Sequence, residues 1–282
     1  MTTASRAGDP DRRRASEINR VRWDALAELH GQDSYYDTHA LVSGRDSLTE
    51  EEDAAVARAV GDVGGLDVLH VQCHIGFDSI SLTRRGARVC GVDFSSASLR
   101  KAETTAQRCG VSVEWVQADV TDLPTALHQR FDLAYATVGV LCWIDDLSAW
   151  MRSVAAALRP GGRLVLIDGH PLMEMMASVE PLVLDMPYAD DGGHTFVSDG
   201  SYAVPEAALP ATAGVYHAHS LGEVVGAALA VGLRIDELTE HLESSFEHRR
   251  GIARLDPDGR WRLRVAGQLL PMLFTLRATR VD

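Results

Sequence analysis

Three short segments carry residues that can hold a hydroxylated ligand with a charged tail, and each follows a predicted strand. In Gln72-Cys73-His74-Ile75-Gly76, the glycine opens a predicted helix, whose free backbone N–H groups favour a carboxylate or a phosphate. Asp93 ends the next strand, where a carboxylate can accept hydrogen bonds from both hydroxyls of a ribose. After the third strand, the Asp119 carboxylate can accept a hydrogen bond from the exocyclic amine of adenine. Together the segments describe a nucleoside with a charged tail.

Apolar, β-branched segments predict the strands that bring these loop ends to one rim. They lie at residues 67–72, 88–93, 112–117, 131–137 and 162–168. Two further strands are predicted at residues 233–241 and 270–279. Between them lies the turn-rich segment 256–259, which favours an antiparallel pair at one edge of the sheet.

Helix signals fill the gaps between the strands. Ser95 or Ser96 caps a helix that closes at Gly110, and helical spacing predicts another over residues 147–158. Capping boxes start two more helices, at Thr49…Glu52 and Ser220…Glu223. Strands that alternate with helices over short loops predict a doubly wound, mostly parallel sheet, which binds its ligands beyond the carboxyl ends of the strands.

Two segments lie outside this alternation. Residues 171–219 are rich in Pro, Gly and Met with weak periodicity, so we expect an inserted lid that binds substrate. Residues 1–16 are polar and are predicted to be a disordered N-terminus, which leaves 17–282 as one domain.

Five motifs resemble a known family. The sequence contains LHVQCHIG (69–76), GVDFS (91–95), FDLAYATVGVLCWIDDL (131–147), LRPGG (158–162) and HP (170–171). Together they resemble the class I S-adenosylmethionine-dependent methyltransferases, and more narrowly a bacterial branch with LHxQCxxG and GVDFS motifs, over roughly residues 18 to 280. The resemblance implies S-adenosylmethionine as cofactor. It also implies a seven-stranded, Rossmann-like, mostly parallel sheet with an antiparallel edge strand.

The resemblance also implies roles for individual residues. Loop residues after the first strand would surround the methionine part of the cofactor, and residues after the next three strands would hold ribose, adenine and the donor methyl. In chain order the implied cofactor residues are Gln72, Cys73, His74, Gly76, Asp93, Phe94, Asp119, Val120, Thr137 and Gly139. The wider family has an acidic residue followed by G-x-G-x-G in the first loop. Here His70, Gln72 and His74 stand in place of the acid and the first two glycines, which argues against a nicotinamide-dinucleotide enzyme.

Two histidines are candidates for a catalytic base. Transfer of a methyl group from a sulfonium needs alignment of donor and acceptor, and needs a base only when the acceptor must lose a proton. His170 follows the fifth strand and His219 precedes the Ser220 cap, so both fall near the predicted site. Four scattered cysteines give no metal-ligand spacing, and no metal is expected.

The net charge and the lengths of the apolar runs disfavour two kinds of partner, nucleic acids and membranes. The net charge of −13 repels phosphate backbones, and no apolar run is long enough to span a bilayer. We therefore expect a cytoplasmic enzyme that methylates an O or N atom of a small molecule, with no nucleic-acid or membrane partner and with a homodimer left open. Two alternatives remain: an RNA or protein methyltransferase, and a cofactor-binding protein of this fold that catalyses another reaction, such as a cyclisation.

Overall fold

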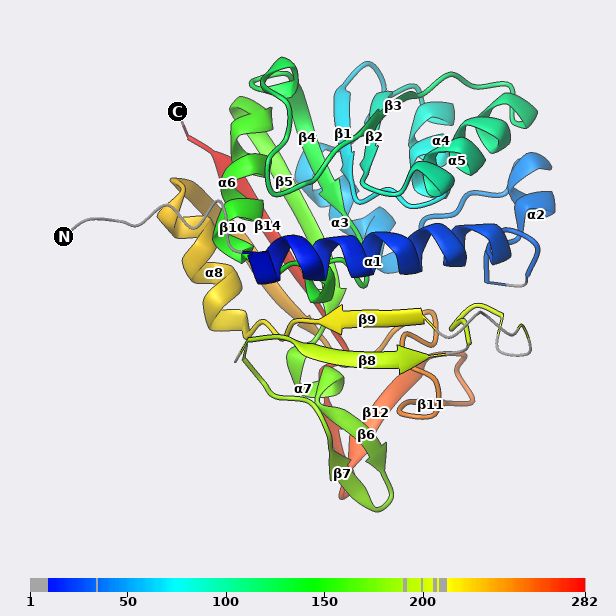
Figure 1. Cartoon of the computed structure of the whole chain (residues 1–282), viewed down its shortest axis with the longest axis vertical. Coiled ribbons are helices and arrows are strands. Elements are labelled where there is room, and N and C mark those ends of the chain that lie inside the picture. The colour runs from blue at the N-terminus through cyan, green and yellow to red at the C-terminus, as the bar shows by residue number, and fades with distance from the viewer. Residues whose placement is uncertain are drawn as a thin grey trace.

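One mixed sheet of seven strands organises the part of the chain that the computed structural model describes, residues 10–33, 35–189, 192–198, 200–204, 207 and 212–281. The strand order is β10-β14-β5-β4-β1-β2-β3 (Figure 1). The bounds are β1 (Asp67–Val71), β2 (Arg88–Asp93), β3 (Glu114–Gln117), β4 (Phe131–Ala136), β5 (Leu158–Gly169), β10 (Leu233–His241) and β14 (Leu273–Arg280). The predicted seven-stranded α/β fold is confirmed.

The two C-terminal strands form the predicted antiparallel pair at one edge. The last strand, β14, runs antiparallel to both β5 and β10, so it lies second from the edge and β10 is outermost. The other pairs, from β5 to β3, are parallel. Because β1 pairs with both β2 and β4, the strand order reverses beside β1. This reversal opens a crevice at the carboxyl ends of these strands.

Helices cover both faces of the sheet, as the alternation predicted. They are α3 (Glu50–Val60), α4 (Phe77–Arg84), α5 (Ser96–Arg108), α6 (Leu147–Ala157) and α8 (Leu221–Ala230), with 3-10 turns η1 (Thr125–Leu127) and η2 (Leu141–Trp143). Both predicted capping boxes are present, at Thr49 and Ser220, and Ser95 caps α5.

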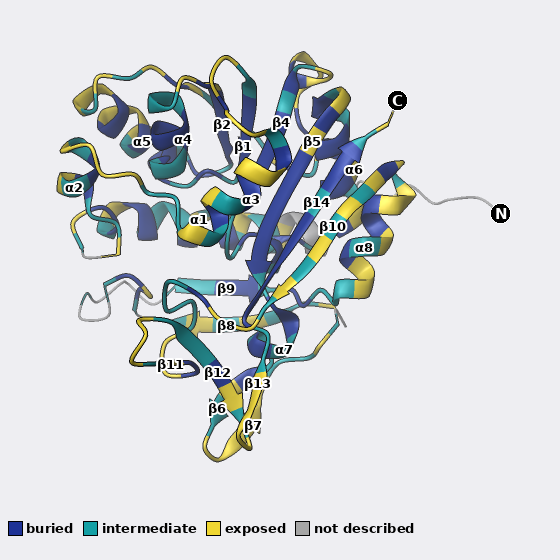
Figure 2. Ribbon diagram, turned by 180° about the vertical axis from the view of Figure 1, so that it is seen from behind, coloured by how far each residue is buried: buried dark blue, intermediate teal, exposed yellow. Residues whose placement is uncertain are grey.

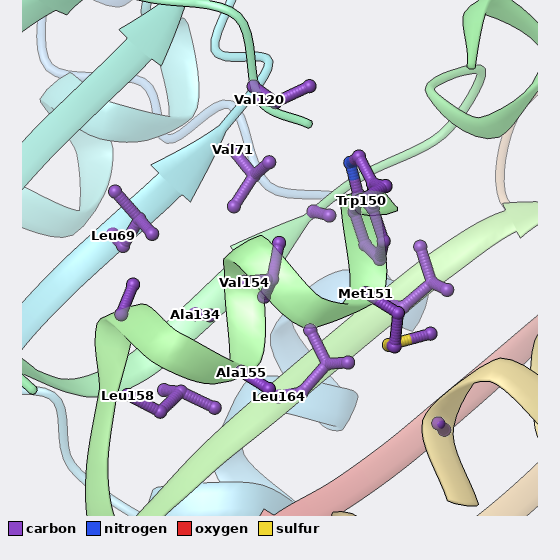
Figure 3. Close-up of a cluster of buried hydrophobic side chains, with 14 of the residues drawn as sticks. Leu69, Val71, Val120, Ala134, Trp150, Met151, Val154, Ala155, Leu158 and Leu164 are labelled. Atoms are coloured by element: carbon purple, nitrogen blue, oxygen red, sulfur yellow. The ribbon is translucent and has the colours of Figure 1, made fainter. Parts of the chain in front are cut away.

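Alternate side chains along the strands lie on opposite faces of the sheet and pack into two separate apolar cores. Leu69, Ala134 and Leu164 face a core shared with α6 and α8, where Trp150 and Met151 are fully buried (Figure 3). Their sequence neighbours face the opposite core, under α3. Figure 2 shows the result: β4, β5 and β14 are buried along most of their length, whereas β10 and α8 expose their outer sides. The sheet is therefore a rigid base for the loops at its edge.

Helix α1 (Pro10–Leu29) corrects one prediction. Residues 10–16, predicted to be disordered with the rest of 1–16, form its first turns, and residues 1–9 lie outside the described part. The polar composition suggested disorder, but the helix is anchored further along, where Leu26 and Ala27 are buried. It is followed by α2 (Thr38–Val42). In Figure 1, α1 crosses the molecule between the sheet and the inserted segment.

The insertion of residues 171–219 adds a layer beyond the carboxyl ends of the strands. It comprises α7 (Pro171–Glu174), the hairpin β6 (Met176–Val179) and β7 (Leu182–Leu184), and the hairpin β8 (His194–Ser198) and β9 (Thr212–Tyr216). A small sheet from the C-terminal region joins this layer, formed by β11 (Arg254–Leu255), β12 (Trp261–Val265) and β13 (Gln268–Leu270). In both views the β8–β9 hairpin lies alongside α1 (Figures 1 and 2). No helix of the described residues is long and apolar enough to cross a membrane.

Candidate functional site

Three adjoining cavities, which share lining residues, occupy the crevice between the sheet edge, α1 and the insertion. The loop cavity, about 130 Å³, is lined by the loops after β1, β2 and β4. The rim cavity, about 50 Å³, lies beside it toward Asp119, and the lid cavity, about 450 Å³, is walled by α1, the insertion and the segment after β10. Trp143 lines all three. A ligand of the first two cavities would therefore lie against a ligand of the third.

The structure brings all ten predicted cofactor residues to the loop and rim cavities. The loop cavity is lined by Gln72, Cys73, His74, Gly76, Asp93, Phe94, Thr137 and Gly139. The rim cavity is lined by Asp119 and Val120, together with Gln72 and Phe94 again. Asp93 and Asp119 therefore face adjoining spaces on one rim of the sheet. Their contact with a cofactor stays a prediction.

The first loop reaches a glycine-like backbone without the usual glycines. Gln72 and His74 have φ of 57° and 48°, in the left-handed region that favours glycine. Side-chain bonds hold this conformation. The Gln72 Nε2 donates to the Val140 carbonyl at 3.0 Å, and its Oε1 accepts from the Trp150 Nε1 at 2.9 Å. Gln72 thus ties the loop to the segment after β4 and to α6.

Gly76 serves packing as much as ligand approach. Its φ is 74°, and a Cβ atom there would lie 2.8 Å from the Ala102 Cβ and would overlap the Trp115 ring. The sequence suggested a glycine kept bare for a ligand. The structure shows that α5 and β3 occupy the space that a side chain would need, which lets α4 begin close to the sheet.

Two carboxylates, the buried Asp93 and the half-buried Asp78, give the loop cavity its electrostatic character. The Asp93 carboxylate accepts from the backbone N–H groups of His74 at 2.9 Å and Ser95 at 2.8 Å, and burial raises its pKa to about 6. Burial and the nearby Glu52 raise the pKa of Asp78 to about 7. Raised pKa values show that ionised carboxylates lack compensating positive charge here. A cationic ligand would supply it.

Asp119 is held for the rim cavity by a local turn. Its Oδ1 accepts from the Thr121 backbone N–H at 2.8 Å and from the Thr121 hydroxyl at 2.7 Å, and the residue is exposed. The neighbouring Val120 is buried in the core beneath α6. An exposed carboxylate beside an apolar side chain suits the polar edge and the flat face of a heterocycle.

A chain of buried histidines borders the loop cavity. The His74 Nε2 lies 2.7 Å from the His30 Nδ1, and the His30 Nε2 lies 2.8 Å from the Ser201 hydroxyl. Burial lowers the pKa of His30 to about 4, so this chain is neutral at pH 7. It links α1, the first loop and the insertion. His30 was missed in the sequence because no local pattern marks a histidine at a helix end as buried.

His70 also borders the loop cavity, in place of the family's acid. Its Nδ1 lies 2.8 Å from the Ser79 hydroxyl, and its Nε2 is buried without a hydrogen-bond partner among the described residues. Burial lowers its pKa to about 3, so the ring is neutral. A buried ring nitrogen at a cavity wall is suited to a ligand's hydrogen bond.

Of the two predicted base candidates, the structure places only His219 in the lid cavity. Its Nε2 lies 2.7 Å from the Ile144 carbonyl, so it donates there and leaves Nδ1 as an acceptor. His170 does not line any of the three cavities. Its Nε2 contacts Glu240 at 2.8 Å, while its Nδ1 accepts from the Leu172 N–H and caps α7. His170 therefore lies outside the lining of these cavities, and its role as a base stays a prediction that this position does not favour.

The sequence did not reveal a second histidine of the lid cavity, His248. It comes from the segment after β10, and its Nε2 lies 2.8 Å from the Glu174 carboxylate, which the insertion supplies. Burial opposes ionisation of Glu174, but His248 and Arg249 hold its pKa below the usual value. The pair lies 74 residues apart in sequence, so no local motif joins them.

The comparisons with known proteins agree with this geometry. Residues 68–162, which include β1 to β4 and the first three loops, match the family model of a methyltransferase domain. This segment is therefore similar to a methyltransferase domain. It supplies most of the residues that line the loop and rim cavities. The insertion and α1, which wall the lid cavity, lie outside the match.

Curated proteins of related sequence match part of the chain. A ubiquinone biosynthesis O-methyltransferase from Methylobacterium sp. (strain 4-46) is 34% identical over 100 residues, 36% of this chain and 39% of that protein. The matches span about two fifths to one half of the length of such curated relatives.

Solved structures extend the likeness of the fold. An S-adenosylmethionine-dependent methyltransferase from Mesorhizobium loti is 21% identical with a TM-score of 0.57, over 85% of this chain and 100% of the other. The Burkholderia thailandensis 1,6-didemethyltoxoflavin-N1-methyltransferase, solved with 1,6-didemethyltoxoflavin and S-adenosylhomocysteine bound, is 17% identical with a TM-score of 0.56, over 99% and 94% of the two chains. At these identities the likeness establishes the fold.

Proposed function

We propose that this protein transfers a methyl group from S-adenosylmethionine to an O or N atom of a small-molecule acceptor. One observation carries the proposal: the loop cavity and the lid cavity lie side by side, with Val138, Gly139 and Trp143 in the lining of both. A donor held by the loops after β1, β2 and β4 would thus face an acceptor held under α1 and the insertion. The methyltransferase domain supplies the first space, and the chain's own additions supply the second.

The residues of the loop cavity suit a cationic donor. S-adenosylmethionine, when bound, supplies a methyl group that its sulfonium charge has already activated. Asp78 and Asp93 are carboxylates at the cavity wall, and their raised pKa values show that ionisation there is short of positive charge. The adjoining rim cavity, with Asp119 and Val120, is placed for the adenine.

The narrower LHxQCxxG and GVDFS branch is also proposed, on the same loops. Its residues build the first loop and the end of β2. The Gln72 bonds to Val140 and Trp150 give the glutamine of that motif a physical role. We infer that the branch replaces backbone freedom from glycine with side-chain anchoring of the loop.

Alignment and exclusion of water are the main tasks of the remaining residues. Trp23 of α1, Trp143 of η2 and Tyr202 of the insertion line both the loop and the lid cavities. These rings can press the acceptor toward the donor and displace water, which matters because in-line transfer depends on close approach of the reacting atoms.

A base is available for an acceptor that must lose a proton. His219 and the His248–Glu174 pair both line the lid cavity, and each ring has its Nε2 committed to a fixed partner. The pair is the stronger candidate, because the Glu174 carboxylate would stabilise the imidazolium that forms when His248 takes a proton.

The structure favours a small acceptor over a macromolecule. The lid cavity is walled by α1, the insertion and the C-terminal region, and its 450 Å³ matches a compact organic molecule. The net charge of −13 also disfavours RNA. A cyclisation or another reaction of the same fold would use the same cavities, so product analysis has to separate it.

Methyl-labelled S-adenosylmethionine gives the test. The purified protein is incubated with the labelled cofactor and a panel of phenols, amines and carboxylates, and the products are analysed by mass spectrometry. Transfer of the label to an acceptor is expected. Calorimetric titration with S-adenosylhomocysteine is run in parallel. Binding without label transfer to any acceptor would favour the non-methylating alternative, and no binding at millimolar concentration would contradict the proposal.

A further inference from the structure

Arg22 of α1 is a buried cation at the wall of the lid cavity. It is 7% exposed, and its Nη1 donates to the Thr212 hydroxyl at 2.8 Å and more weakly to the Thr212 carbonyl at 3.4 Å. Its Nε is buried with no hydrogen-bond partner among the described residues. A guanidinium offers five N–H donors in a planar fork that matches a carboxylate. This one therefore has donors left for a ligand.

No carboxylate of the described residues forms an ion pair with Arg22. Arg20, two residues earlier on the same helix, pairs with both Glu17 and Asp24. Arg249, the other arginine of the lid cavity, pairs with Glu174 at 3.7 Å. Burial also lowers the pKa of Arg22, which shows that its charge is poorly compensated. Because buried charge is costly without a partner, such a residue points to an anionic ligand.

The carboxylates that share the cavity are already engaged. Asp168 accepts from the backbone N–H groups of Gly139, Leu141 and Gly169. Glu174 contacts His248 at 2.8 Å and accepts from the Tyr216 hydroxyl at 3.4 Å. Neither is bonded to Arg22. The Arg22 guanidinium is thus the cation of this cavity without a carboxylate partner among the described residues, which suits a ligand that brings a carboxylate of its own.

The guanidinium lies over an aromatic ring. The Arg22 Cζ lies 5.0 Å from the centre of the Phe196 ring, and that ring lies 6.3 Å from Trp143. Gly214 of β9 pairs with Phe196 of β8 and leaves room for this contact. A Cβ atom at Gly214 would overlap the Phe196 ring and come within 3.1 Å of the Arg22 Cδ. The apolar walls suit a flat ring beside the charge.

We propose that the acceptor is an aromatic carboxylic acid whose carboxylate pairs with Arg22 and whose ring lies against Phe196 and Trp143. This inference rests on the proposed function, since it names the substrate class of the lid cavity. The donor cavity is acidic and the acceptor cavity holds an unpaired cation. The two ligands would therefore be distinguished by charge as well as by shape.

The test compares acids with their neutral counterparts. Hydroxybenzoates and hydroxynaphthoates, each with its amide, are titrated by calorimetry into the wild type in the presence of S-adenosylhomocysteine. The acids are expected to bind roughly tenfold to a hundredfold more tightly than the amides. Arg22→Gln should remove this preference, and Arg22→Lys should restore part of it. Arg20→Gln, on the exposed side of the same helix, is the matched control and should keep the full preference.

Three results would overturn the proposal: equal binding of acids and amides by the wild type, no binding of any acid at millimolar concentration, or an unchanged preference in Arg22→Gln. Inorganic phosphate is the competing probe, and displacement of the acids by phosphate at equal concentration would also count against a carboxylate site. Cofactor binding is measured separately. If S-adenosylhomocysteine does not bind while the acids still require Arg22, the proposed function fails and the ligand class stands.

Discussion

The carboxylates of the loop cavity predict how cofactor affinity depends on pH. Asp78 and Asp93 have pKa values raised to about 7 and about 6, so at pH 6 the first is mostly and the second about half protonated, whereas both are mostly ionised at pH 8. The attraction of Asp78 for the ammonium group of S-adenosylhomocysteine is then weakened, as is the acceptance of ribose hydroxyls by Asp93. Calorimetry should show affinity falling by roughly tenfold over this range. Asp78→Asn should bind more weakly at pH 8 and respond less to pH.

The control for that experiment is a ligand without the amino-acid tail. 5′-Methylthioadenosine lacks the ammonium group but keeps the ribose, so its binding should respond to pH between 6 and 8 less than that of S-adenosylhomocysteine, through Asp93 alone. If the affinities of both ligands change equally with pH, protonation of the carboxylates alters the structure of the cavity and does not act through attraction to the ammonium group.

Two glycines with the same backbone test how far Gly76 is required for packing. Gly76 and Gly110 have φ of 74° and 70°, but a Cβ would overlap Trp115 only at Gly76, and it would meet nothing within 4 Å at Gly110. Gly110→Ala should cost about 1 kcal/mol of unfolding free energy for the backbone alone, and Gly76→Ala about 2–4 kcal/mol because overpacking adds to it. Urea denaturation measures both. Equal losses would show that only the backbone matters.

Histidine substitutions separate the base from the structural cap. With a phenolic acceptor, His248→Gln should lower kcat by about a hundredfold or more, and His219→Gln should have the same effect if His219 is the base instead. The KM for the cofactor should stay constant. His170→Gln should leave the pH profile of kcat unchanged, since its ring bonds Glu240 and the start of α7. Full activity in both of the first two variants would remove the need for a base.

Sequence patterns revealed the residues that are marked by their own neighbours. Asp93 follows a clear strand and Asp119 the next, so both could be assigned to one rim without a structure. Arg22 and His248 could not be assigned, because their importance depends on burial and on partners far away in the chain. The Arg22 contact with Thr212 spans 190 residues.

Among the helices and strands, too, those marked by their own sequence were predicted, and one that depends on distant contacts was not. The range of β2 and the start of α8 were predicted to the residue, because β-branched alternation and capping boxes are local. Helix α1 was not predicted, because what holds it lies in the insertion. The buried Asn19 pairs with Val215 of β9: its Nδ2 donates to the carbonyl at 3.0 Å and its Oδ1 accepts from the N–H at 2.8 Å.

This pair of bonds predicts that Asn19 fixes the wall of the lid cavity. Asn19→Ala would leave two buried backbone groups without partners, which should lower the unfolding free energy by about 2–4 kcal/mol. It should also raise the KM for the acceptor, because Tyr216 of β9 lines the lid cavity, and that for the cofactor, because Asn19 itself lines the rim cavity. Val21→Ala, on the exposed side of the same helix, is the control. An unchanged KM for the acceptor would contradict this assignment.

For the whole molecule, two sets of groups titrate with opposite effects on stability. His30 and His70 have folded pKa values of about 4 and about 3, so the unfolded chain takes up protons below pH 6.5 that the fold does not, and stability falls as the pH falls. Asp78 and Asp93 have raised values. Their contribution is fully present below about pH 4 and is lost as the pH rises through 6 and 7.

Single substitutions should therefore tilt the pH dependence of stability in opposite directions. Between pH 4.5 and 6, His30→Gln removes a group whose stability contribution increases with pH, so the variant's slope should be lower than that of the wild type by about 1.4 kcal/mol per pH unit. Asp78→Asn should raise the slope by a similar amount. The exposed His39→Gln should run parallel to the wild type. Chemical denaturation at several pH values measures these slopes. If the His30 and Asp78 variants also run parallel to the wild type, burial does not control these groups, and the charge argument for both cavities loses its basis.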